Sequence, residues 1–142
     1  MNDTYIYMAM EKDIEAKEEY LKNMGRKIKT ISDIYIKSFA KKAQSLAKDP
    51  IFSIPESKER VIQNYENSKN TLLKIFENYL QSFMEMRKWI KEKDEEFQVI
   101  ASLENDSIKN LYQRVVKMEQ TINELESEMV NSKNILECTI LI

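Results

Sequence analysis

Residues 108–129 read IKNLYQRVVKMEQTINELESEM, and this stretch has the clearest apolar pattern in the sequence. Its apolar residues recur at alternating steps of three and four positions, which is the a/d pattern of a heptad repeat. The seam they form comprises Ile108, Leu111, Val115, Met118, Ile122, Leu125 and Met129. Most positions between them are polar or charged. A narrow apolar stripe on such a helix packs against another helix, from the same chain or from a second one.

The composition predicts helices in the rest of the chain as well. One Gly and two Pro among 142 residues are too few for the many tight turns that sheets require. Both prolines, Pro50 and Pro55, lie in one short segment, which we expect to end one helix and to precede the next. We therefore predict an all-α protein with long helices at about 4–48, 54–104 and 106–136.

The first two predicted helices carry apolar stripes with a few interruptions. In the first helix the stripe continues through Tyr35 to Phe39, Ala43 and Leu46, with a small shift after Tyr35 and one polar residue, Lys17, at a stripe position. The stripe keeps its phase through Gly25, so we expect one continuous helix there. In the second helix the frame is interrupted at Lys69 and Lys93, and in the third helix it decays after Met129, where Ser132 falls at a d position.

The register changes between the second and third helices. At Glu104 the heptad frame shifts by four residues, which indicates either a stutter in a continuous coiled coil or a turn at 105–107. Because no Gly or Pro marks a turn, we favour a continuous or gently bent helix. Residues 1–104 would then form an antiparallel helical hairpin, and residues 105–142 a coiled-coil oligomerisation helix with an apolar tail. The alternative is a compact three-helix bundle.

The residue inventory argues against catalysis. The chain has no His and a single Cys, Cys138, so it contains no Ser-His or Cys-His nucleophile system and no structural zinc site. One Gly is too few for a phosphate-binding loop. We expect no enzyme activity, cofactor or metal. The lone cysteine favours the cytoplasm or another reducing intracellular compartment, and no apolar run is long enough for a transmembrane segment.

One stretch stands out by its charge. Residues 22–48 contain eight basic residues and one Asp. The basic residues are Lys22, Arg26, Lys27, Lys29, Lys37, Lys41, Lys42 and Lys48. They form either a solvated helix face or a docking surface for an acidic partner, nucleic acid or an anionic membrane surface.

Two functions are consistent with these features. The leading prediction is a non-enzymatic coiled-coil assembly subunit or scaffold, which associates with itself or with a helical partner through the 108–129 seam. The alternative is an adaptor or inhibitor that docks an acidic partner through the basic 22–48 helix, with nucleic acid or an anionic surface ranked below a protein. A third arrangement is a free-standing bundle that satisfies its own seam.

Overall fold

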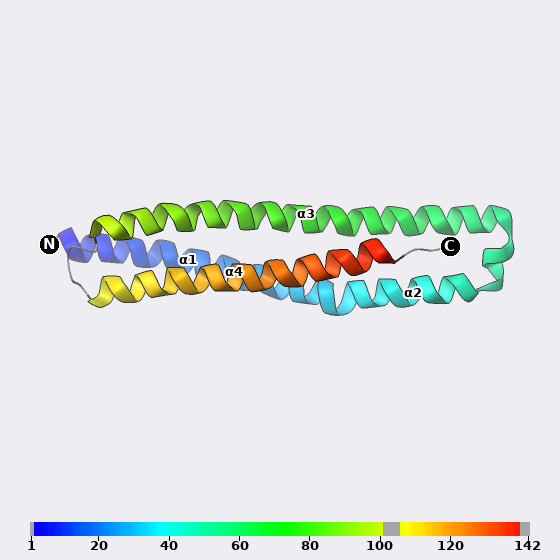
Figure 1. The fold of residues 1–142 in the computed structure, drawn as a ribbon, viewed down its shortest axis with the longest axis horizontal. Helices are drawn as coiled ribbons and strands as arrows, with labels where there is room; N and C mark the ends of the chain where they lie inside the picture. Colours follow the sequence, from blue (N-terminus) through cyan, green and yellow to red (C-terminus); the bar gives the residue numbers. More distant parts are fainter. Residues whose placement is uncertain (1, 101–105, 140–142) are drawn as a thin grey trace. The chain divides into compact units, whose positions relative to one another are not determined.

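Long helices follow from the scarcity of residues that end them. The computed structural model describes residues 2–100 and 106–139, without the side chains of 2–4, 6, 51, 52, 99 and 100. Its elements are α1 (Asn2–Thr30), η1 (Ile31–Ile36), α2 (Lys37–Lys48), η2 (Pro50–Ser53), α3 (Pro55–Ile100) and α4 (Asp106–Cys138), shown in Figure 1. The described residues contain no strand, and the protein is all-α, as predicted.

The two prolines determine the break between α2 and α3. Asp49 is extended, with φ −74° and ψ 133°, because the ring of Pro50 disfavours a helical residue before it. After the short 3-10 turn η2, the Lys58 N–H donates to the Ile54 carbonyl over 2.8 Å. Pro55 therefore occupies the first turn of α3, where its missing N–H leaves no helical hydrogen bond unmade.

A π-helical segment changes the register of the first helical stretch. The sequence predicts Tyr35 in the apolar stripe, but Tyr35 is 57% exposed and Ile36 is 2% exposed. That prediction is wrong because η1 is π-helical, and its wider turns take in extra residues and rotate the following side chains. The helical path from α1 into α2 is thus unbroken, as predicted, but it is not a regular α-helix throughout.

Contacts divide the chain into two units. Unit 1 comprises Met1–Lys27 and Gln81–Glu126, and unit 2 comprises Ile28–Leu80 and Ser127–Ile142. Helices α1, α3 and α4 each contribute residues to both units, and η1, α2 and η2 belong to unit 2.

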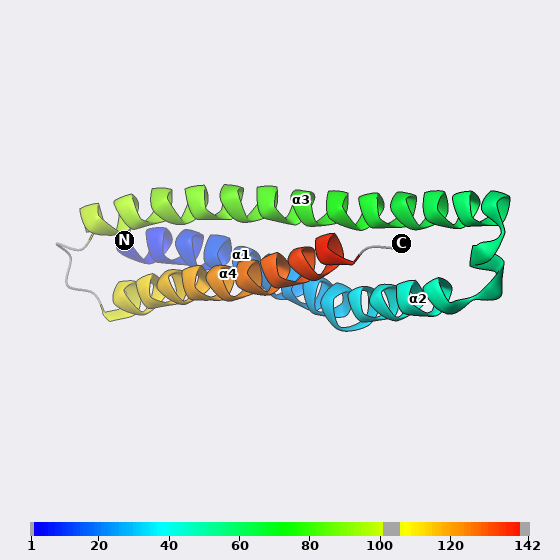
Figure 2. The same ribbon diagram turned by 45° about the vertical axis from the view of Figure 1, so that its right-hand side comes forward.

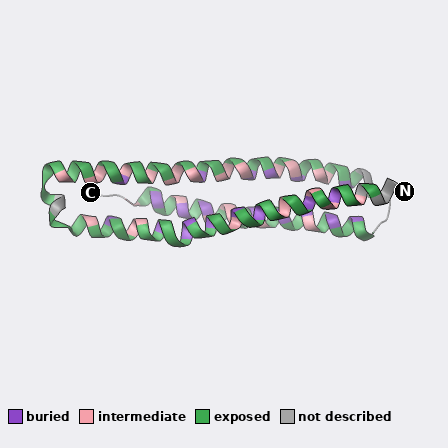
Figure 3. Cartoon of the chain, turned by 180° about the vertical axis from the view of Figure 1, so that it is seen from behind, coloured by how far each residue is buried: buried purple, intermediate pink, exposed green. Residues whose placement is uncertain are grey.

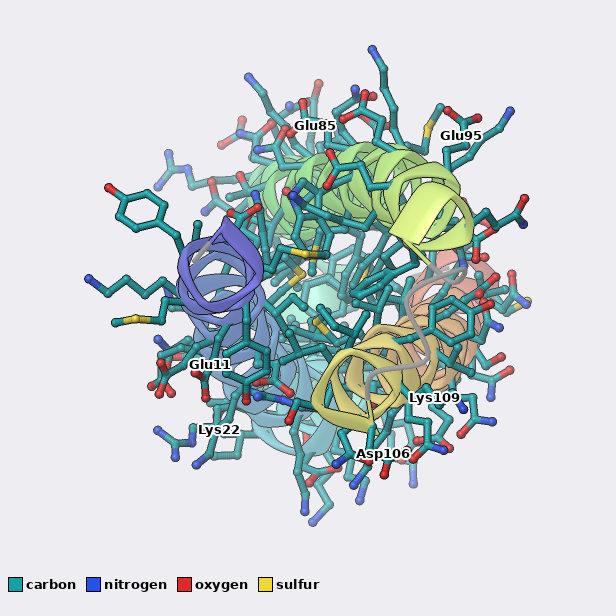
Figure 4. All side chains as sticks on the ribbon, turned by 90° about the vertical axis from the view of Figure 1, so that its left-hand side faces the viewer. Glu11, Lys22, Glu85, Glu95, Asp106 and Lys109 are labelled. Atoms are coloured by element: carbon teal, nitrogen blue, oxygen red, sulfur yellow. The ribbon has the colours of Figure 1, made fainter. Side chains whose placement is uncertain are left out.

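Three helical segments pack around one core in unit 1. Viewed from the end in Figure 4, α1, α3 and α4 surround the interior, and labelled side chains such as Glu85, Glu95 and Lys109 point away from it. The core residues are Met10, Ile14, Leu21, Met24, Phe83, Met86, Ile90, Phe97, Ile108, Leu111, Val115, Met118 and Ile122. This arrangement corresponds to the three-helix alternative.

Helices α3 and α4 do not follow each other along one straight axis. The ring centroids of Phe97 and Tyr112 are 5.4 Å apart, whereas a continuous helix would separate residues fifteen positions apart by about 22 Å. The prediction of a continuous or gently bent helix is therefore wrong, because α4 runs back along α3 in unit 1. The proposed stutter at Glu104 and the first residue of the proposed turn, Asn105, lie outside the described residues.

Unit 2 has a core of its own, which thins toward η2. The buried residues include Ile28, Ile31, Ile36, Phe76, Met129 and Leu136. Among the described residues from 37 to 64, only Ala43 is buried, and most of this stretch is coloured as exposed in Figure 3.

Candidate functional site

The 108–129 seam is covered by the chain itself. Six of its seven residues are buried, with Ile122 at 0% exposure, and Leu125 is half-buried. A Cβ atom added at Gly25 would lie 3.5 Å from a Leu125 methyl group, which is an ordinary van der Waals contact, so α1 and α4 pack against each other at this point. The predicted interface with a second chain stays a prediction, and forming it would require these side chains to leave their contacts within the chain.

Ion pairs flank the seam on both sides in unit 1. The Arg114 guanidinium donates to both carboxylate oxygens of Glu18, with 3.2 Å from Nε to Oε2. This hydrogen bonding raises the pKa of Arg114. Arg87 pairs with Glu126 and donates to the Asn123 amide oxygen over 3.0 Å. The two pairs join α4 to α1 and to α3, and so help to hold α4 in register.

Two lysines at apolar stripe positions meet around Trp89 in unit 1. The Nζ atoms of Lys17 and Lys93 lie 5.7 and 5.6 Å from the centre of the indole ring. Lys93 also pairs with Asp13 at 2.9 Å and with Glu96 at 3.2 Å. Burial lowers the pKa of Lys93, but the hydrogen bonds to both carboxylates outweigh it, and the pKa is raised. These lysines therefore stabilise the α1–α3 packing.

The other polar residues on the apolar stripes have partners in unit 2. The Ser132 hydroxyl donates to the Ser32 hydroxyl over 2.8 Å, and both side chains are buried. Lys69 and Tyr65 donate to the Thr139 carbonyl over 3.4 and 3.0 Å, just past the end of α4. Lys69 thus satisfies carbonyl groups that a helix C-terminus leaves unpaired. Burial, with a smaller contribution from Glu66, raises the pKa of Tyr65.

The described residues include no cluster of side chains that could hold a metal ion. No group of three or more His, Cys, Asp or Glu side chains among them is placed to hold a metal ion. Cys138 is exposed, and no buried side-chain nitrogen or oxygen in the described part of the chain lacks a hydrogen-bond partner. No helix of the described residues is both long and apolar enough to cross a membrane.

The basic residues of the 22–48 stretch are all exposed, but they belong to different units. Three of them, Lys22, Arg26 and Lys27, lie in unit 1, and the other five lie in unit 2. The densest group is on α2, which contains four lysines and no acidic residue.

The lysines of α2 lie on two parts of its surface. An α-helix turns by about 100° per residue. The positions of Lys37, Lys41 and Lys48 therefore form one stripe, opposite the apolar side of α2 (Phe39, Ala43 and Leu46). We call these three residues the basic stripe. Lys42 is placed beside the apolar side. The structure records no ion pair or hydrogen bond from the basic stripe to another described residue.

The apolar side of α2 faces α3 in what we call the hairpin cluster, which comprises Phe39, Ala43, Leu46, Val61, Ile62 and Tyr65. The rings of Phe39 and Tyr65 stack with centroids 4.5 Å apart. A groove of about 210 Å³ runs along this cluster, lined by Phe39, Lys42, Leu46, Val61, Asn64, Tyr65 and Ser68. A second hollow, also lined by Phe39, Lys42 and Ser68, extends to Tyr35 and Leu72.

Sequence reasoning missed this groove. The apolar stripe identified most of the residues of the hairpin cluster, but it did not indicate that α4 ends before covering them. The one available signal was the aromatic and aliphatic content on both sides of the proline segment. Comparisons of the chain with protein-family models, with curated proteins and with solved structures found no match.

Proposed function

We propose that this chain is a non-enzymatic interaction module, and that unit 2 docks an acidic protein partner through α2. The observation that carries the proposal is the charge of α2, with four exposed lysines and no acidic residue in twelve positions. The chain as a whole has a net charge of −2, so this charge is local.

The basic stripe is suited to electrostatic docking. Lys37 and Lys48 are eleven residues apart, which corresponds to about 16 Å along a helix. At physiological salt the Debye length is about 8 Å, so an acidic surface must approach closely and match the spacing of the lysines. Since these ammonium groups have no recorded partner among the described residues, binding would not have to break an internal ion pair.

An acidic protein is favoured over nucleic acid and membrane. The basic residues of α2 are all lysine, with no arginine to pair bidentately with base edges. The basic stripe holds three lysines on one short helix, fewer than the four to eight clustered basic residues typical of anionic-lipid binding.

The assembly hypothesis ranks second. Self-association through the 108–129 seam would require exposure of Ile122 and its neighbours, which are buried in unit 1. Burial of those side chains already stabilises the folded chain, so an interface between chains could not gain the same burial again.

A charge-reversal pair tests the proposal. The Lys37→Glu/Lys41→Glu/Lys48→Glu variant removes the basic stripe. The Lys12→Glu/Lys88→Glu/Lys91→Glu variant reverses three exposed lysines of unit 1 and changes the net charge equally. The probe is fluorescent poly-L-glutamate, measured by anisotropy at several salt concentrations, beside duplex DNA and anionic vesicles.

We expect poly-L-glutamate binding to weaken with salt and to fall about tenfold or more in the stripe variant. The unit 1 variant should remain within about threefold of the wild type. Equal losses in both variants would show that binding depends only on the net charge of the chain. Tighter binding to DNA or to vesicles than to poly-L-glutamate would mean that the ligand is not an acidic protein.

A further inference from the structure

Unit 2 changes from three packed helical segments to two along its length. The Ser32–Ser132 hydrogen bond and the contacts of Thr139 with Tyr65 and Lys69 mark where α4 lies against the rest of the unit. Helix α4 ends at Cys138. In Figure 2, α2 and the start of α3 continue as a pair beyond the red end of α4. No third described segment accompanies them there.

Two helices do not enclose the apolar residues in this region. Of the hairpin cluster, only Ala43 and Tyr65 are buried, while Phe39, Leu46, Val61 and Ile62 stay partly exposed. Ile54, nearby at the start of α3, is 51% exposed. These partly exposed side chains leave apolar area that a further helix would bury.

The groove along the cluster carries a single kind of charge. Lys42 lines both hollows, and the other described residues lining them are apolar or uncharged. Asn64 and Ser68, both exposed, lie on the α3 side of the groove. An apolar surface with a cation beside it fits a ligand that has an apolar stripe and an anionic flank.

We propose that the hairpin cluster binds one amphipathic helix of the acidic partner, which packs against α2 and α3 as a third helix. This inference rests on the proposed function, because it takes the partner to be acidic, and it adds the form in which the partner binds. Twelve-residue α2 is about 18 Å long, so the bound helix has about three turns. Its apolar residues meet Phe39, Leu46 and Val61, and its carboxylates meet Lys42.

A second copy of the chain fits this groove less well. Symmetric pairing of two hairpin clusters would bring two α2 helices together, each with four lysines and no acidic residue. Like charges at such short range oppose association.

The test uses the full chain and a synthetic helix as the probe. The probe is a fluorescein-labelled, stapled peptide of about two heptads, with Leu at a and d and Glu elsewhere. A second peptide has Lys in place of Glu. Asn64→Trp fills the groove from an exposed position without removing a core residue, and Asn70→Trp places the same side chain at an exposed position that does not line it.

We expect the acidic peptide to bind, Asn64→Trp to weaken binding about tenfold or more, and Asn70→Trp to change it by less than about twofold. Circular dichroism should show both variants equally helical. Equal binding of the Lys peptide would overturn the acidic character of the ligand. A dimer in light scattering that Asn64→Trp dissociates would overturn the partner helix in favour of a second copy.

The outcomes also separate this inference from the proposed function. If Asn64→Trp leaves peptide binding unchanged while the basic-stripe reversal abolishes it, the groove inference fails and electrostatic docking stands. If poly-L-glutamate binds and the helical peptide does not, the groove inference again fails and electrostatic docking stands. If Asn64→Trp weakens peptide binding but the stripe reversal leaves poly-L-glutamate binding unchanged, the groove stands and docking through the basic stripe fails.

Discussion

The buried serine pair offers a sharp test of how α4 packs in unit 2. Ser32 lies in η1 and Ser132 in α4, one hundred positions apart, with 2.8 Å between their hydroxyl oxygens. They are the two buried polar side chains among the described residues, at 9% and 5% exposure. The perturbation is a double-mutant cycle of Ser32→Ala, Ser132→Ala and the combined variant.

The expected energies follow from which hydroxyl loses its partner. Either single change leaves the other buried hydroxyl without its hydrogen bond, at a cost of about 1–3 kcal/mol. For Ser132→Ala in α4, the higher helix propensity of Ala offsets about 0.5 kcal/mol of this cost. The double variant leaves no unpaired hydroxyl at this contact and replaces both groups with methyls, so its stability should be close to that of the wild type. The coupling energy, which is the sum of the two single costs minus the cost of the double variant, is therefore about 2–6 kcal/mol.

Urea unfolding followed by circular dichroism measures all four proteins. We expect both single variants to unfold at lower urea and the double variant to unfold near the wild-type midpoint, with unchanged m-values. Additive single effects, with a coupling below about 0.5 kcal/mol, would mean that the two hydroxyls do not meet. The placement of α4 beside η1 would then be wrong.

Three further predictions concern unit 1. Gly25→Ala should stabilise the protein by up to about 1 kcal/mol, because the added methyl meets Leu125 at an ordinary 3.5 Å and alanine favours the helix; a lower urea midpoint would contradict this. Ile122→Ala should cost about 2–5 kcal/mol, since Ile122 is 0% exposed, and a midpoint equal to the wild type would show that it is not in a core. The raised pKa of Lys93 means that its contribution is complete below the ordinary value of 10.5 and is lost as pH rises through the folded pKa. The thermal midpoint of Lys93→Met should therefore fall less than that of the wild type above about pH 10.5, and parallel curves would refute this assignment.

Much of the fold could be predicted from local sequence features. The scarcity of Gly and Pro predicted an all-α protein, and Pro50 and Pro55 located the break between α2 and α3, because proline restricts the residue before it and lacks an N–H donor. The heptad pattern also identified the buried face of α4. These features act over a few residues, so the sequence displays them directly.

The partner of each buried face could not be predicted in the same way. A heptad seam shows which side of α4 is apolar, but it does not show whether the covering helix comes from the same chain. In the sequence, the polar residues Lys17, Lys93 and Ser132 interrupt the apolar stripes. In the structure each meets a residue distant in sequence, such as Trp89 or Ser32.

The sequence shows a small shift of the stripe after Tyr35 but not its cause, and it does not show the groove. The π-helical turns of η1 bury Ile36 in place of Tyr35, and no residue type specifies such turns. The open groove exists because α4 ends at Cys138 before covering Leu46 and Val61. Its position depends on the lengths and pairing of three helices together.

The concentration dependence of unfolding tests whether the 108–129 seam is core within one chain. If Ile122 and the other seam residues are covered by their own chain, the urea midpoint should stay constant over about a hundredfold range of protein concentration. If the seam is instead an interface between chains, the midpoint should rise with concentration, because folding would then be linked to association. A rising midpoint would contradict this account and restore the assembly hypothesis.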